Sequence, residues 1–199
     1  MKYFPVYVFL SFPLTLVLYI ILFTSNLEYS EEIVINSNIN KVIKLHEDST
    51  YMNKYINGFI NYNLISGDLR QEDAVSELTV LFSTKDPVTR KIIMKEKIIS
   101  NNLPSEKKII LSTLAVENTI KYRFVKLSES KTMFVREHKY NFSRYMKVKA
   151  FFMSSTFKRQ SRIYLQKFKE FAEEAGETTI EEDVLDVDSK DSLISNLKQ

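Results

Sequence analysis

The chain has 199 residues, of which 44% are hydrophobic and 27% are charged, which is enough for about one globular domain and unlike a disordered or fibrous chain. It has no cysteine and two widely separated histidines, His46 and His138, so disulfides and a cysteine nucleophile are excluded and we expect neither metal nor cofactor. The net charge of +3 divides into +10 over residues 1–172 and −7 over residues 173–199, and because the basic residues never form a run of five, we expect no nucleic-acid partner.

The N-terminal segment is strongly apolar. No charged side chain occurs between Lys2 and Glu28, and residues 3–23 are almost continuously hydrophobic apart from a proline at position 13. At about 1.5 Å per residue, a helix of this length spans roughly 31 Å, which matches the hydrocarbon core of a bilayer. We therefore predict a transmembrane anchor within residues 1–27, with residues 3–24 in contact with the bilayer.

A cleaved signal peptide is the alternative for this segment, with Lys2 as its charged start. The apolar run is longer than the usual signal-peptide core of about 7–15 residues, and no Ala-x-Ala cleavage pattern follows it. Lys2 precedes the run, whereas Glu28, Glu31 and Glu32 follow it. The positive-inside rule then slightly favours a single-pass protein with its N-terminus inside and its domain on the outer face of the membrane.

A strand and two short helices are predicted next. Residues 32–36 are rich in β-branched side chains and end at Asn and Ser, which is typical of a short strand. Residues 37–40 offer capping side chains for a helix over residues 39–45. A second helical turn is predicted around residues 48–55, before Asn57 and Gly58 end it.

Residues 59–142 change to the alternating pattern of β-strands. Turn-forming separators divide this region into six strand candidates, at residues 59–66, 74–83, 89–100, 107–116, 118–127 and 131–142. Because the connections are short, we expect neighbouring strands to pair antiparallel. Apolar residues recur at every second position, as in Ile120, Tyr122 and Phe124, so one face of the sheet is predicted to be buried.

The C-terminal part returns to helical spacing. Residues 151–174 place an apolar stripe that includes Phe157, Tyr164 and Phe168 opposite a basic face, which predicts a helix that covers the sheet. Contact of the basic face with a membrane surface is the alternative. Residues 176–199 are acidic and lack aromatic side chains, and they are predicted to form a mobile tail.

This order of elements resembles the START-like superfamily, also called SRPBCC or polyketide cyclase-like proteins. The resemblance covers about residues 30–174 and rests mainly on the opening segment 33–42 and the closing segment 157–171, neither of which is a catalytic motif. It implies an α+β helix-grip fold, in which a curved seven-stranded antiparallel sheet wraps a long C-terminal helix, and a domain over residues 28–175. The sequence departs from many relatives in having no tryptophan near residues 51–55 and in its apolar N-terminal segment.

The resemblance also implies a cavity between sheet and helix that holds lipids, sterols, polyketides or other apolar ligands. A one-sided sheet under an amphipathic helix is consistent with such a pocket, although a closely packed core fits the same pattern. The leading hypothesis is a membrane-tethered binding module for a hydrophobic or lipid-like small molecule. A polyketide cyclase- or dehydratase-like enzyme and an interaction protein whose acidic tail recruits a partner are the alternatives.

Polar residues on the apolar strand faces are the candidates for a ligand site. Three such residues lie an even number of positions from apolar residues on the same strand, and are therefore predicted to point inward with them: Glu96 on one strand, and Arg136 and His138 on another. Arg136 can supply the partner that a buried Glu96 needs, which leaves His138 and Tyr122 for the polar head of a ligand. His138 with Glu96 is also the acid–base pair available to the enzyme alternative. The predicted ligand contacts are Glu96, Tyr122, Arg136, His138, Phe157 and Tyr164.

The competing interpretation of these polar residues is structural. They form a buried ion pair without a ligand, or a one-residue shift in register turns all of them towards solvent.

Overall fold

The chain forms one curved antiparallel sheet and a set of helices on its concave side. A computed structural model describes residues 12–19, 27–83 and 89–196. Its elements are β1 (Leu27–Ile35), α2 (Ile39–Glu47), the 3-10 turn η1 (Ser49–Tyr51), α3 (Met52–Tyr55), β2 (Phe59–Ser66), β3 (Val75–Ser83), β4 (Thr89–Asn102), β5 (Glu106–Ser112), β6 (Val116–Ser128), β7 (Lys131–Phe142) and α4 (Arg144–Asn196). The 7-stranded sheet has the order β1-β7-β6-β5-β4-β3-β2, so β1 pairs with the last strand of the chain.

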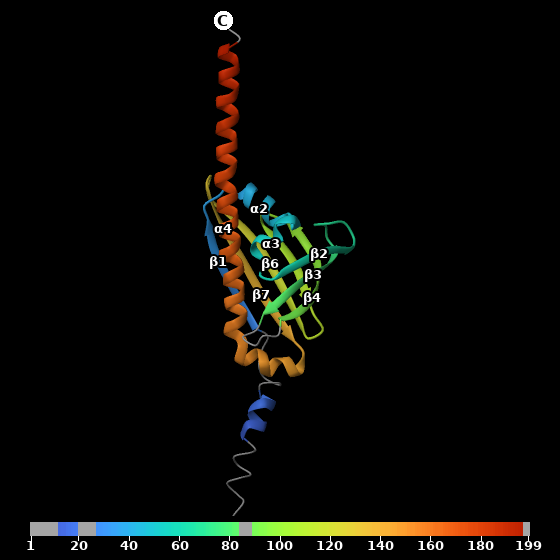
Figure 1. The fold of residues 1–199 in the computed structure, drawn as a ribbon. Helices are drawn as coiled ribbons and strands as arrows, with labels where there is room; N and C mark the ends of the chain where they lie inside the picture. The colour runs from blue at the N-terminus through green and yellow to red at the C-terminus, as the bar shows by residue number, and fades with distance from the viewer. Residues whose placement is uncertain (1–11, 20–26, 84–88, 197–199) are drawn as a thin grey trace, which may run out of the picture.

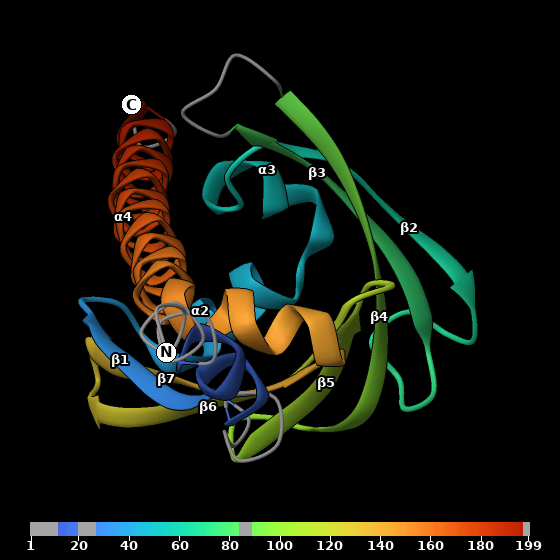
Figure 2. The same ribbon diagram turned by 90° about the horizontal axis from the view of Figure 1, so that it is seen from below.

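Helix α4 lies along the β1 edge of the sheet and contacts α3 (Figure 1). Seen from the end, its first part runs across the open end of the sheet, and the rest turns to run beside β1 (Figure 2). The short helices α2 and α3 lie inside the curve of the sheet, facing α4 (Figure 2). This arrangement is the predicted helix-grip fold, with an interior bounded by the sheet on one side and by helices on the other.

Local sequence explains how α2 and α3 are fixed inside the sheet. The side chain of Asn38 accepts a hydrogen bond from the backbone N–H of Asn40 at 2.9 Å and caps α2. Gly58 turns the chain from α3 into β2 with a φ of +68°, and a Cβ atom there would lie 2.1 Å from the carbonyl oxygen of Leu81. Glycine is therefore required where this turn passes close to β3.

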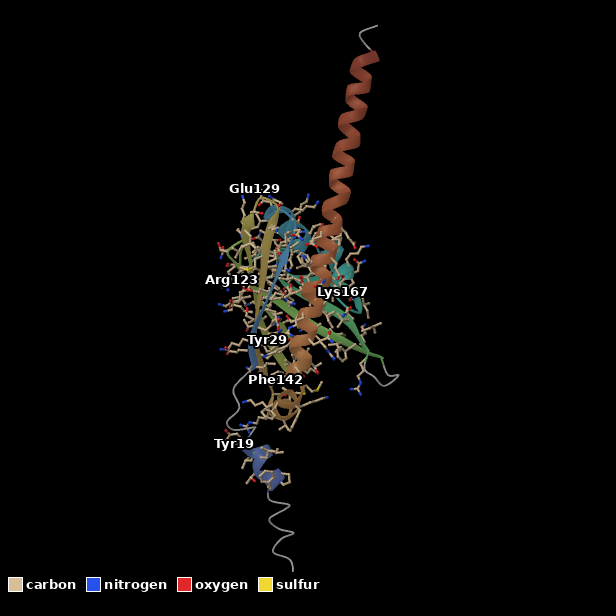
Figure 3. All side chains as sticks on the ribbon, turned by 90° about the vertical axis from the view of Figure 1, so that its left-hand side faces the viewer. Tyr19, Tyr29, Arg123, Glu129, Phe142 and Lys167 are labelled. Atoms are coloured by element: carbon tan, nitrogen blue, oxygen red, sulfur yellow. The ribbon has the colours of Figure 1, made fainter. Side chains whose placement is uncertain are left out.

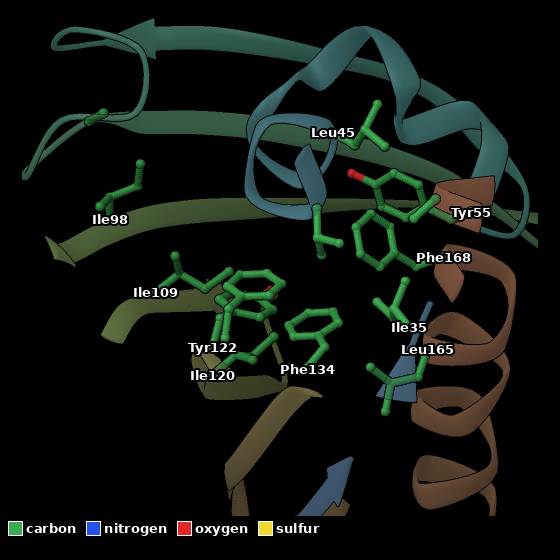
Figure 4. Close-up of a cluster of buried hydrophobic side chains, with 14 residues drawn as sticks. Ile35, Leu45, Tyr55, Ile98, Ile109, Ile120, Tyr122, Phe134, Leu165 and Phe168 are labelled. Carbon is green, nitrogen blue, oxygen red and sulfur yellow. The ribbon is translucent and has the colours of Figure 1, made fainter. Parts of the chain in front are cut away.

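The packed part of the interior lies where α4, α2 and α3 meet β1, β6 and β7 (Figure 4). Phe134 is completely buried at its centre. Its ring stacks on Phe124 with centroids 4.4 Å apart and meets the edge of Phe168 of α4 at 5.5 Å. Aromatic contacts of this kind join the sheet to the long helix.

The predicted strands agree with the structure to within a few residues, and the differences lie at the ends of elements. β1 begins at Leu27, five residues before the predicted start, because Leu27 pairs with Tyr140 of β7. Helix α4 begins at Arg144, since the carbonyl of Ser143 accepts backbone hydrogen bonds from residues 146 and 147. The acidic segment, predicted as a mobile tail, continues α4 as helix to Asn196, and no proline or further glycine interrupts it beyond Gly176.

The predicted anchor is described only in part. Residues 12–19 form a helical stretch in which Phe12 and Leu14 are exposed. Residues 1–11 and 20–26 of the anchor lie outside the described residues. Among the helices that are described, none has both the length and the apolar character needed to cross a membrane.

Candidate functional site

A cavity of about 330 Å³ lies between the concave face of the sheet and the helices. The sheet contributes a mainly aliphatic wall because every second residue of each strand points to this face. The aliphatic residues and methionine on this wall are Leu78, Val80, Ile92, Met94, Ile98, Ile109, Leu111 and Ile120. Helix α4 lines the opposite side with residues 157, 160, 161 and 164.

All six predicted ligand contacts line this cavity. They come from three strands and one helix, and they are Glu96 of β4, Tyr122 of β6, Arg136 and His138 of β7, and Phe157 and Tyr164 of α4. In the register of the sheet, Tyr122 lies opposite Arg136, and Ile120 lies opposite His138. The predicted inward register is therefore confirmed, and the alternative that turns these residues to solvent is wrong.

The predicted pairing of Arg136 with Glu96 is wrong. Arg136 is on β7 and Glu96 is on β4, and the strand order places β5 and β6 between them. Strands lie about 4.8 Å apart, so the two backbones are separated by roughly 14 Å. Both side chains point to the concave face, as predicted, but they approach the cavity from different sides.

Arg136 is buried among tyrosine rings. Its guanidinium carbon lies 3.8 Å from the ring centroid of Tyr164 and 5.4 Å from that of Tyr122. Its Nε atom is buried without a hydrogen-bond partner. None of the ion pairs found among the described residues includes Arg136. The cavity wall therefore contains a buried cation held by aromatic faces and by a hydrogen bond with the side chain of Tyr122, and not by a carboxylate.

Glu96 has a different partner on the far side of the cavity. The hydroxyl of Tyr62 on β2 donates a hydrogen bond of 2.8 Å to Glu96 Oε1. Burial raises the pKa of Glu96, and this outweighs the lowering effect of the Tyr62 hydrogen bond. The protonated, neutral carboxyl is therefore favoured more than at the surface.

His138 forms a hydrogen-bonded group with Asn118 and Ser161. Its Nε2 atom lies 3.0 Å from Ser161 Oγ, and its Nδ1 atom lies 3.1 Å from the side-chain nitrogen of Asn118. Burial, followed by the nearby charge of Arg136, lowers the pKa of His138 to about 2. The ring is then neutral near pH 7 and is a weak base. His138 and Glu96 contact different residues, so the predicted acid–base pair is not assembled.

A buried ion pair that the sequence analysis did not identify lies at another part of the wall. Lys107 Nζ of β5 is 2.8 Å from Glu47 Oε1 at the end of α2, and both side chains are about one-tenth exposed. Burial raises the pKa of Glu47, but His46 and Lys107 together lower it to about 2. His46 Nε2 also lies 3.2 Å from the hydroxyl of Tyr164, which connects this pair to α4.

Some of these additional residues had a sequence signal and others had none. Asn118 lies two and four positions from Ile120 and Tyr122, on the same face of the strand, and Ser161 lies four residues from Phe157 on the same helical face. The sequence therefore predicts that both side chains point inward. The contact between Glu47 and Lys107 depends on how α2 sits against β5, which no periodicity in the sequence encodes.

Comparison with known proteins identifies the fold. No family model and no curated protein sequence matches the chain. A conserved protein from Geobacillus kaustophilus superposes with a TM-score of 0.62 and 12% identity, over 75% of this chain and 97% of that chain. The Zhui aromatase/cyclase of a Streptomyces species gives a TM-score of 0.57 and 10% identity, over 75% and 94%.

Norcoclaurine synthase from Thalictrum flavum, solved in complex with dopamine and hydroxybenzaldehyde, gives a TM-score of 0.55 and 14% identity, over 76% of this chain and 88% of that chain. Each of these structures matches most of both chains at very low sequence identity. The similarity concerns the arrangement of the sheet and helices and not individual site residues. The chain thus shares its fold with these structures, and this is the helix-grip fold that its order of elements predicted.

Proposed function

We propose that this protein is a membrane-tethered binding module for a hydrophobic or lipid-like small molecule, held between the sheet and α4. The observation that carries the proposal is the cavity of about 330 Å³ with an aliphatic wall and a few buried polar side chains. Ligand pockets in proteins have this composition and volumes of roughly 300–1,000 Å³. A closely packed domain needs no such hollow.

The solved structures with the same fold support a small-molecule role. The Streptomyces protein is an aromatase/cyclase, and the synthase from Thalictrum flavum holds dopamine and hydroxybenzaldehyde. These names describe enzymes, whereas the acid–base pair that we expected for an enzyme is not assembled here, since Glu96 contacts Tyr62 and His138 contacts Ser161. We therefore propose binding in preference to catalysis.

Filling the cavity tests the binding proposal. Val80 of β3 lines the cavity, while the next residue, Leu81, points to the other face and is 45% exposed. We expect Val80→Phe to reduce the amount of small molecule that co-purifies with the full-length chain by about tenfold or more, because the added ring occupies the binding volume. Leu81→Phe is the matched control, and it should leave the amount unchanged. The measurement is mass spectrometry of molecules released on denaturation.

An equal yield of released molecules from Val80→Phe, Leu81→Phe and the unsubstituted chain would show that they are bound elsewhere. A folded chain that releases nothing, and that takes up no member of a lipid panel, would contradict the proposal altogether.

The proposed tether is supported by exposed apolar side chains at the end of the domain where the N-terminal segment joins the sheet. Leu27 begins β1 at this end. The backbone N–H of Ser143 donates a hydrogen bond of 3.1 Å to the carbonyl of Ala115, which brings the β5–β6 turn to the start of α4. Figure 3 shows Tyr29 and Phe142 at this same end. Leu114 of the β5–β6 turn, and Phe151 and Phe152 in the first turns of α4, are more than half exposed. Exposed apolar side chains of this kind are found on surfaces that contact a membrane or another protein.

The tether predicts that the full-length chain stays in the membrane pellet after carbonate extraction, because a spanning segment is not removed by high pH. A chain that begins at Glu28 should be released into the supernatant. Release of the full-length chain would refute the anchor. For the proposed orientation, a C-terminal reporter that is active only in the cytoplasm should give no signal, and full signal would place the domain on the inner side.

A further inference from the structure

We infer that the bound molecule is amphipathic and carries a carboxylate head that pairs with Arg136, while its apolar body lies against the aliphatic wall formed by β3, β4 and β5. This inference rests on the proposed binding function and specifies its ligand class. It starts from the position of Arg136, which is only 6% exposed and lines the cavity.

Arg136 is the buried cation of the described cavity wall that has no oppositely charged partner. The other buried cation, Lys107, is neutralised by Glu47 at 2.8 Å. Burial favours the neutral forms of Glu96, His46 and His138, because it raises the pKa of the carboxyl and lowers the pKa of both rings. Glu96 is bonded to Tyr62 and lies three strands away from Arg136, so the positive charge of Arg136 has no counter-charge beside it, which favours an anionic occupant at this position.

The hydrogen-bonding capacity of Arg136 is also incompletely used. A guanidinium has five N–H donors, and a buried one without acceptors loses its hydration energy. The ring of Tyr164, 3.8 Å from the guanidinium carbon, and a side-chain hydrogen bond with Tyr122 offset part of this loss, but Nε has no partner. A carboxylate matches the planar donor fork with two parallel hydrogen bonds. The head group that best completes this site is therefore a carboxylate.

The position of Arg136 within the sheet sets the direction of the ligand. Arg136 is on β7, and the strand order leads from there through β6 to β5, β4 and β3. The aliphatic side chains of these last three strands, including Ile109, Ile98 and Leu78, continue the same wall. A molecule with its head at Arg136 thus has room for its apolar body across the sheet and away from the charge. This geometry requires polar and apolar ends on one molecule.

Three probes with the same ten-carbon chain test the head group: decanoate, decan-1-ol and decylamine. They are titrated against the full-length protein in nanodiscs, and the dissociation constant of each is measured by competition with isotopically labelled decanoate. We expect decanoate to bind at least about tenfold more tightly than decan-1-ol, because its carboxylate forms charge-assisted hydrogen bonds with the guanidinium of Arg136. Decylamine should bind least, because its ammonium group is repelled by Arg136.

The matched variants are Arg136→Met and Arg123→Met. Arg123 lies on β6, is about half exposed and pairs with Glu137 outside the cavity (Figure 3). Arg136→Met should weaken decanoate binding about tenfold and change decan-1-ol binding by less than about twofold. Arg123→Met removes the same charge and should change neither constant. Partition of the probes into the bilayer is common to both variants, so it cancels in this comparison.

The outcomes separate this inference from the proposed function. Equal affinity of the unsubstituted chain for decanoate and decan-1-ol, with both lost in Val80→Phe, would overturn the carboxylate head and leave the cavity as a binding site. Binding that is insensitive to Val80→Phe for every probe would instead contradict the binding function itself. The comparison of head groups on the unsubstituted chain needs no variant once the affinity of each probe is corrected for its partition into empty nanodiscs, so it decides the question even where Arg136→Met does not fold.

Discussion

Phe134→Ala is expected to lower the free energy of unfolding by about 3–5 kcal/mol, the range for removing a fully buried aromatic ring. The ring has no exposed surface, stacks on Phe124 at 4.4 Å, and meets Phe168 at 5.5 Å and His46 at 5.2 Å. These neighbours belong to β6, α4 and α2, so the substitution leaves a cavity where the sheet meets both helices. Domains are stable by only about 5–15 kcal/mol, and a large share of the stability would be lost.

Phe152→Ala is the control for this prediction, because it makes the same chemical change on the same domain. Phe152 is 68% exposed near the start of α4, and its substitution should change the free energy of unfolding by less than about 0.5 kcal/mol. Both variants are measured by chemical denaturation of the full-length chain. Similar losses for the two would mean that Phe134 is not the centre of the packed core.

The interior has a packed half and a hollow half. Phe134, Phe124 and Phe168 fill the space between β6, β7 and α4, and none of them lines the cavity. The cavity continues from this packed group towards β3 and β4, where the sheet curves away from α4 (Figure 2). Substitutions in the two halves therefore separate stability from binding. Phe134→Ala addresses the first, and Val80→Phe addresses the second.

Much of this arrangement was predictable from the sequence because it depends on local periodicity. The alternation of Ile120, Tyr122 and Phe124 identified the buried face of the sheet, and the same parity rule placed Arg136 and His138 inward. Strand parity placed four of the six candidate residues on the cavity wall, and helical spacing placed Phe157 and Tyr164 there. The cavity itself needed the structure, since the same pattern fits a closely packed core.

The pairing of polar side chains was not predictable, because it depends on which strands are neighbours. Arg136 and Glu96 have the right charges and the right parity, but two strands lie between them. Glu96 instead accepts a hydrogen bond from Tyr62 of β2. In the order of the sheet, only β3 lies between β2 and β4. Parity gives the face of a sheet on which a side chain lies, whereas strand order and curvature give its partner.

The buried pair of Glu47 and Lys107 predicts a strong dependence of stability on acidity. The pKa of Glu47 is about 2 in the folded chain against 4.5 for the ordinary side chain. Because the folded value is the lower one, the stabilising contribution of the carboxylate is complete above pH 4.5 and is lost as the pH falls towards 2. The difference corresponds to about 3 kcal/mol of unfolding free energy, and it needs no large correction for solvent because both side chains are mostly buried.

Glu47→Gln keeps the shape of the side chain and removes its charge, so it should isolate this contribution. We expect the variant to be less stable than the unsubstituted chain by about 3 kcal/mol at pH 7, since Lys107 is left buried without its partner. Between pH 4.5 and 2 the variant should lose less stability than the unsubstituted chain, and the two unfolding curves should converge. Chemical denaturation at a series of pH values measures both effects.

Asp73→Asn provides the matched change at an exposed ion pair. Asp73 lies 2.9 Å from Lys97 and is 85% exposed, and its backbone φ of +64° is one that asparagine accepts. Water and salt screen such a pair, so the substitution should alter neither the stability at pH 7 nor its acid dependence to a marked degree. If Glu47→Gln behaves like Asp73→Asn, then the pair of Glu47 and Lys107 is as weak as a surface pair. The positive charge of Lys107 would then need no partner at the cavity wall, and Arg136 would no longer differ from Lys107 in lacking one.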